Sequence, residues 1–144
     1  MIQGPDLARG LVRFLADPQD TESAIGAGFL VSERHIVTCA HVVAEALGIE
    51  RDMAELPTKP VYLDWPLVGT GAATAKVIVW HPLRDDERVV DVDDIAILEL
   101  SGDLPRAKEV EPLPVIPLTN PHDREVRMCG FPRPEGCWTD GKLQ

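Results

Sequence analysis

Apolar and polar residues alternate along several short segments of the chain, which is the pattern of β-strands with one buried face. In the segment VYLDW, Val61, Leu63 and Trp65 fall on one face, and Tyr62 and Asp64 fall on the solvated face. The alternation predicts strands at residues 11–15, 26–32, 35–38, 61–65, 75–80 and 94–100, with two more at 125–131 and 138–144. The predicted fold class is therefore all-β and antiparallel.

One stretch follows a helical period instead. Between residues 39 and 47, Val42, Val43, Ala46 and Leu47 recur at the spacing of one helix face, and Gly48 is suited to end the helix. Further along, prolines at 112, 114 and 117 prevent regular ladder pairing and stiffen the backbone. We therefore expect a short helix of about two turns and a proline-rich linker over residues 101–124.

Composition narrows the classes of function. The 144 residues carry 24 acidic and 14 basic side chains, a net charge of −10, and this length suits one domain. Residues 81–103 alone hold eight acidic and two basic side chains, and we interpret most of this acidic run as a solvated loop. Such a field repels phosphate, so nucleic acid is excluded as a partner. No apolar run approaches the ~18 residues of a membrane span, so no membrane partner is expected.

The three cysteines, Cys39, Cys129 and Cys137, are odd in number and widely spaced, which suits a reducing compartment better than a disulfide framework. The first residues, MIQGPDLARGLVRFLADP, lack the basic start, apolar block and cleavage site of a secretory signal. We therefore expect a cytoplasmic protein.

Candidate chemistry concentrates in residues 26–43, GAGFLVSERHIVTCAHVV. Gly26 and Gly28 permit close backbone approach, and a hairpin through 32–35 returns the chain toward a strand-to-helix corner at His41. A histidine fixed by backbone on both sides suits a general base. Asp94 opens the apolar strand DIAILEL 53 residues later, so the two meet only if the sheet closes on itself.

These segments resemble the trypsin-like, chymotrypsin-fold serine proteases. In that family the TCAHVV-like segment carries the catalytic histidine, matching His41, and the D-I-A-L-L strand opens with the catalytic aspartate, matching Asp94. The resemblance, over roughly residues 8–144, implies a six-stranded first β-barrel over 1–100, a crossover linker over 101–124, and opening strands of a second barrel over 125–144. The GAGFLVS and GFP segments are most similar to non-secreted bacterial multidomain members.

The chain departs from the family pattern in one respect. No G-D-S-G-G or G-x-S-G segment is present, and the only serines, Ser23, Ser32 and Ser101, lie in the first-barrel part. The resemblance then implies the N-terminal part of a serine endopeptidase acting on polypeptides, with no cofactor and with its nucleophile, specificity pocket and further domains after Gln144. The isolated chain is expected to be inactive and to self-associate through unpaired strand edges.

Several alternatives stay open. The fold also suits an inactive, protease-derived binding module, which a native gene ending at residue 144 would favour. Asp93 competes with Asp94 for the carboxylate role, and Cys137 is a second, weaker nucleophile assignment because no glycine follows it. Cys39 is interpreted as a small buried side chain. A zinc site is the alternative, built from Cys39, His41, Cys129 and Cys137, although no close C-x-x-C pair is present. The remaining histidines are interpreted as surface or strand-end residues: His35, His81 and His122.

Overall fold

The computed structural model describes residues 8–68, 72–84, 93–102, 110–115, 125–130 and 137–142, and in the last two ranges it describes the side chains of residues 129 and 130 only. The strands are β1 (Leu11–Leu15), β2 (Ala24–Leu30), β3 (His35–Thr38), β4 (Val61–Asp64), β5 (Ala73–His81), β6 (Ile95–Leu100), β7 (Glu125–Gly130) and β8 (Cys137–Lys142). The helix α2 spans Ala40–Leu47, and a single 3₁₀ turn, η1, spans Thr21–Ser23.

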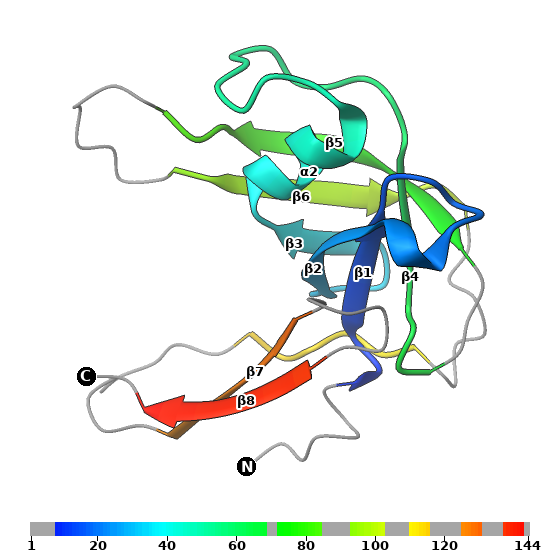
Figure 1. Ribbon diagram of the computed structural model, residues 1–144, viewed down its shortest axis with the longest axis vertical. Coiled ribbons are helices and arrows are strands. Elements are labelled where there is room, and N and C mark those ends of the chain that lie inside the picture. Colours follow the sequence, from blue (N-terminus) through cyan, green and yellow to red (C-terminus); the bar gives the residue numbers. More distant parts are fainter. Residues whose placement is uncertain are drawn as a thin grey trace.

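Six strands form one closed antiparallel barrel in the order β1-β2-β3-β6-β5-β4. The barrel closes where β1, at the start of the chain, pairs with β4 as well as with β2. Figure 1 shows α2 against one side of this barrel and the β7–β8 hairpin on another side, below β1 and β2 in that view. The prediction of an all-β fold with a six-stranded barrel and one short helix after residue 41 is confirmed.

The barrel interior is filled by the apolar positions that the alternation predicted. Val61, Leu63 and Trp65 are each fully buried, as the period of two in VYLDW requires. Other strands of the barrel supply further buried apolar side chains to the same core. The other largest members of this core are Val12, Phe14, Leu30, Ile36, Val43, Leu98 and Val110. Because β1, β3, β4 and β6 all contribute, the core holds the two strands that lead into the candidate site at fixed positions.

The outer face of β4 differs from the prediction. Asp64 was expected to face solvent, but it is buried, because Arg13 lies directly opposite it on β1. The Nε of Arg13 donates to Oδ1 of Asp64 at 2.9 Å, and a second guanidinium nitrogen donates to Oδ2. A bidentate pair of this kind satisfies both charged groups in a dry environment, and it ties the two strands that close the barrel.

Most predicted element boundaries agree within two residues. The helix was predicted over 39–47 and starts one residue later, and Gly48 follows its last turn as expected. Strand β2 begins and ends two residues earlier than predicted because the hairpin turn starts at Val31, whose N–H donates to the carbonyl of His35 at 2.9 Å. Among the residues that the structure describes, no helix is long and apolar enough to cross a bilayer.

Part of the predicted linker lies against the barrel. In residues 110–115, the N–H of Leu113 donates to the carbonyl of Leu30 at 2.7 Å, and Val110 is buried. A Cβ at Gly10 would lie 2.6 Å from Cγ of Leu113, so glycine lets this segment pass close to the start of β1. The segment is not a strand, as its prolines require. Residues 103–109 and 116–124 of the predicted linker lie outside the described residues.

Candidate active site

The N-terminus of α2 sets the position of His41. Cys39 occupies the N-cap position, but its side chain makes no capping hydrogen bond. The N–H of His41, one of the amides that a helix start leaves without an intrahelical partner, donates instead to Oδ1 of Asp94 at 2.9 Å. A carboxylate at this end of a helix also interacts favourably with the helix dipole. A residue 53 positions away in the chain therefore caps the helix that carries His41.

Helix α2 is seated on the barrel by contact with a glycine. A Cβ at Gly26 would lie 2.7 Å from Cγ2 of Val42, so only glycine lets the helix pack this closely on β2. At Gly28, a Cβ would lie 2.8 Å from the carbonyl oxygen of Val37 on the paired strand β3. Close approach was predicted at both glycines, and the structure shows a side chain against Gly26 and a backbone carbonyl against Gly28. The position of His41 relative to the barrel therefore depends on Gly26.

Asp94 reaches the same place from the turn before β6. Strand β3 pairs with β6, with Thr38 opposite Ala96, so the residues just after β3 and just before β6 lie side by side. Direct pairing of these strands is therefore sufficient, a more local condition than the barrel closure that was expected. Asp94 has φ of +57°, a left-handed conformation that is uncommon for a residue other than glycine. Strained backbone of this kind clusters at functional sites.

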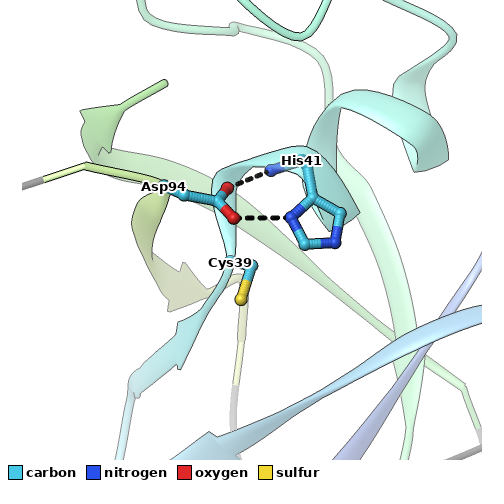
Figure 2. Close-up of side chains that lie close together, drawn as sticks. All are labelled: Cys39, His41 and Asp94. Atoms are coloured by element: carbon cyan, nitrogen blue, oxygen red, sulfur yellow. Dashed lines mark hydrogen bonds and ion pairs between the residues drawn. The ribbon is translucent and has the colours of Figure 1, made fainter. Parts of the chain in front are cut away.

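His41 and Asp94 form a hydrogen-bonded pair (Figure 2). Nδ1 of His41 lies 2.7 Å from Oδ2 of Asp94, while Oδ1 holds the backbone N–H of the same histidine. Because an ionised carboxylate only accepts hydrogen bonds, Nδ1 is the nitrogen that carries the proton in the neutral imidazole, and Nε2 then has the free lone pair. The side chains are 36% and 23% exposed, respectively, so the pair lies at the surface of the barrel. The arrangement can take up a proton at Nε2 and stabilise the resulting imidazolium.

Comparison with known proteins identifies the family. The sequence model described as "trypsin-like peptidase domain" matches residues 26–144, most of the chain. The chain belongs to the trypsin-like peptidase family. Both candidate residues of this trypsin-like domain lie within the matched range. A search of curated proteins found no match.

Solved structures agree on the fold of the trypsin-like domain. Kallikrein-related peptidase 10 superimposes with a TM-score of 0.55 at 18% identity, covering 90% of this chain and 52% of that one. Neuropsin, described as a serine protease expressed in the limbic system of mouse brain, gives 0.59 at 14% identity, covering 94% of this chain and 60% of that one. The trypsin-like chain thus spans between half and three-fifths of the length of these two proteases.

Cys39 differs from its expected state in this trypsin-like site. It was expected to be a small buried side chain, but the residue is exposed at the β3–α2 junction. Partial burial of the thiol and, secondarily, the negative charge of Asp94 raise the pKa of Cys39. Its sulfur, a nitrogen of His41 and a carboxylate oxygen of Asp94 all lie within 4.8 Å of one another. Asp94, which sequence reasoning did not count as a ligand, thus joins this group.

Of the other residues weighed as metal ligands, Cys129 is the one whose side chain the structure describes. Within the described side chains, Cys129 does not belong to the group formed by Cys39, His41 and Asp94. The side chain of Cys137, which was also weighed as a nucleophile, lies outside the described residues. The sequence left open a four-residue zinc set as an alternative, whereas the described side chains bring together a different set of three that includes a carboxylate.

Asp93, the competing carboxylate, faces the backbone. Its Oδ1 accepts from the N–H of Asp94 at 2.9 Å, and its Oδ2 lies 3.5 Å from the N–H of Arg84. These contacts support the strained turn before β6, while Asp94 alone of the two bonds to His41. Of the other histidines, His35 begins β3 and His81 ends β5, as expected, and His122 lies outside the described residues.

The described hydrogen bonds of the three serines are made with residues other than His41 or belong to turns. The hydroxyl of Ser23 donates to the carbonyl of Asp20 at 2.6 Å and belongs to the turn around η1. The hydroxyl of Ser32 lies in the β2–β3 turn, and Ser101 follows β6. Within the described part of the chain, the backbone N–H and the ring of His41 both bond to Asp94, and neither bonds to a serine.

Ser32, His35 and Glu99 form a second serine, histidine and carboxylate set that sequence reasoning missed. Oγ of Ser32 lies 2.7 Å from Nδ1 of His35, but Nε2 of His35 is 3.8 Å from the carboxylate of Glu99, beyond hydrogen-bonding distance. The same hydroxyl accepts from the backbone N–H of His35 at 3.1 Å. This serine closes a hairpin turn, which is a common structural use of the residue.

Proposed function

We propose that this chain carries the histidine and aspartate of a trypsin-like serine endopeptidase, with His41 as general base and Asp94 as its orienting carboxylate. The observation that supports this role is the 2.7 Å contact between Nδ1 of His41 and Oδ2 of Asp94, made by a carboxylate that also holds the histidine backbone. Family membership supplies the reaction class, hydrolysis of peptide bonds.

The chemistry follows from the tautomer. Nε2 of His41 accepts the hydroxyl proton of a serine as its oxygen bonds to the carbonyl carbon of the peptide, and it then gives that proton to the leaving amine. Asp94 keeps the proton on Nδ1 and stabilises the imidazolium formed between these steps. Asp94 accepts one hydrogen bond from the ring and one from the backbone N–H of His41, so the histidine has less freedom to lose on reaching the transition state.

The nucleophile completes the proposal. None of Ser23, Ser32 and Ser101 bonds to His41, and a trypsin-like site draws its serine and its oxyanion hole from the second barrel. We therefore assign the serine, the oxyanion donors and the specificity pocket to sequence after Gln144. The cytoplasmic location, the bacterial multidomain type and the self-association of the isolated chain stay predictions.

The test is covalent labelling of the product of the native, untruncated gene with a fluorophosphonate probe, followed by mass analysis of the labelled peptide. We expect one adduct, on a serine after residue 144, and hydrolysis of a polypeptide substrate. His41→Ala and Asp94→Asn should each slow labelling by about 10³-fold or more, because both disable the base.

Ser32→Ala is the matched control, since it removes the serine of the second set. Labelling should be unchanged in this variant. An adduct on Ser32, or labelling that does not depend on His41, would contradict the proposed site. A native product that ends at residue 144 and takes up no probe would overturn the protease proposal in favour of a protease-derived binding module.

A further inference from the structure

The proposed proteolytic mechanism uses His41 and Asp94 but gives no role to the thiol beside them. Cys39 comes from the β3–α2 junction, His41 from the first turn of α2 and Asp94 from the turn before β6 (Figure 2). A sulfur, a nitrogen and an oxygen from these three side chains lie within 4.8 Å of one another. Two distant segments of the chain, the start of α2 and the turn before β6, thus bring three different ligand atoms close together.

The types of these ligand atoms select the metal. A thiolate, an imidazole and a carboxylate together suit Zn²⁺, whereas Mg²⁺ and Ca²⁺ prefer sites built from oxygen alone. Zn²⁺ with three protein ligands keeps a fourth position for water. Because all three side chains lie at the surface or only partly buried, an ion can reach them from solvent.

The spacing is compatible with such an ion after a small rearrangement. Tetrahedral Zn²⁺ at ordinary bond lengths places a sulfur and a nitrogen about 3.6 Å apart, and a nitrogen and an oxygen about 3.4 Å apart. Nδ1 of His41 and Oδ2 of Asp94 are now 2.7 Å apart, so they would separate by less than about 1 Å. The hydrogen bond from the His41 N–H to Oδ1 keeps the carboxylate in place as this occurs.

We propose that Cys39, His41 and Asp94 bind Zn²⁺, and that the bound ion switches off the general base. Zinc on Nδ1 of His41 replaces the hydrogen bond to Asp94 and moves the ring proton to Nε2. The thiol of Cys39 binds as thiolate, releasing one proton to solvent. With Nε2 protonated, the neutral imidazole has no lone pair there for a serine proton. This second step rests on the proposed function, but zinc binding does not.

Binding is tested on the 144-residue chain itself with Co²⁺ as the spectroscopic probe and Zn²⁺ in calorimetric titration. We expect one equivalent of Co²⁺, visible absorption typical of tetrahedral coordination, and a near-ultraviolet thiolate-to-cobalt band that Zn²⁺ removes. Cys39→Ser should abolish the thiolate band and weaken Zn²⁺ binding by more than about 10-fold, because loss of a direct ligand costs at least as much as loss of an outer-shell partner. Circular dichroism checks that the variant stays folded.

Cys129→Ala is the matched control, since Cys129 is a cysteine whose described side chain lies outside the cluster. It should keep the band and the affinity. A band that survives Cys39→Ser, or that disappears in Cys129→Ala, would place the metal elsewhere, and failure of the unmodified chain to bind would also overturn the proposal.

The inhibition by zinc is tested on the native gene product, by measuring how fast the fluorophosphonate probe labels it. Zn²⁺ should slow fluorophosphonate labelling, and a chelator should restore it. When each labelling rate is divided by the same protein's zinc-free rate, Cys39→Ser should raise the half-inhibiting Zn²⁺ concentration more than about 10-fold over that of the unmodified protein. Zinc binding without inhibition would overturn the switch. A protein that binds zinc but takes up no probe even in chelator contradicts the proposed protease function and leaves the metal site standing.

Discussion

Two acid–base pairs join distant parts of this chain, and they differ in what surrounds them. Arg13 and Asp64 face each other across β1 and β4, with side chains only 6% and 9% exposed. His41 and Asp94 join a helix start to a strained turn, with side chains 36% and 23% exposed. Both are short, direct contacts. The comparison teaches that burial decides their use: the first pair holds the barrel closed, while the second stays accessible to a reacting group.

The energetics of the two pairs differ for the same reason. A buried ion pair costs so much desolvation that it adds little net stability, yet the loss of one partner leaves the other charge without its main compensation. A partly exposed pair is screened by water, so its contribution to stability is small. The barrel therefore depends strongly on Asp64 and weakly on the charge of Asp94.

The largest effect should come from breaking the buried pair on one side. Asp64→Ala removes the acceptor of two guanidinium hydrogen bonds, and we expect the free energy of unfolding to fall by about 3 kcal/mol in urea denaturation. The double variant Arg13→Met, Asp64→Leu should recover most of that loss, because neither charge then remains. Equal losses in the single and double variants would show that shape, and not charge, governs this position.

The seat of α2 gives the next largest effect, and it couples the barrel to the site. In Gly26→Ala the new Cβ would lie 2.7 Å from a methyl group of Val42, a stiff, buried, β-branched side chain. Because Val42 cannot rotate away, the helix must shift, and we expect a loss of about 2 kcal/mol in the free energy of unfolding. The imidazole proton signal of His41 should move as well. A loss of stability with an unmoved signal would separate the helix seat from the dyad.

The sequence predicted the parts of the fold that depend on local pattern. Alternation placed β1 at residues 11–15 as observed, and it assigned Val61, Leu63 and Trp65 to the core. A period of two reports which face is apolar, so strands that line one core are readable from sequence. The contact of His41 with Asp94, by contrast, was expected from the family resemblance, on the condition that the sheet closes on itself. The 53-residue spacing alone does not require this contact.

What the sequence did not predict depends on register between strands. Asp64 looked like a solvated outer residue, because alternation says nothing about which side chain will lie opposite. Its burial follows from the pairing of β1 with β4, which sets Arg13 across from it. The left-handed backbone of Asp94 and the exposure of Cys39 were missed for a similar reason. Both depend on how the β3–α2 junction and the turn before β6 lie side by side once β3 pairs with β6.

A smaller effect should separate the charge of Asp94 from its backbone conformation. Asparagine tolerates a left-handed φ and can still accept from the N–H of His41, whereas alanine does neither. We therefore expect Asp94→Ala to lower the free energy of unfolding by about 1 kcal/mol more than Asp94→Asn does. Urea denaturation of the two variants measures the difference. If they are equally stable, the helix cap and the turn contribute nothing through this residue.

The smallest change in stability is expected at Glu99, an exposed carboxylate that lies near two basic side chains. Glu99 is 3.8 Å from His35 and 3.6 Å from Lys76, and all three side chains are at least one-third exposed. Glu99→Gln should change the free energy of unfolding by less than about 0.5 kcal/mol, since exposed ion pairs contribute little. The labelling rate of the native gene product should also be unchanged. A large loss of labelling would favour His35 over His41 as the base, because of these two histidines it is His35 that lies beside Glu99.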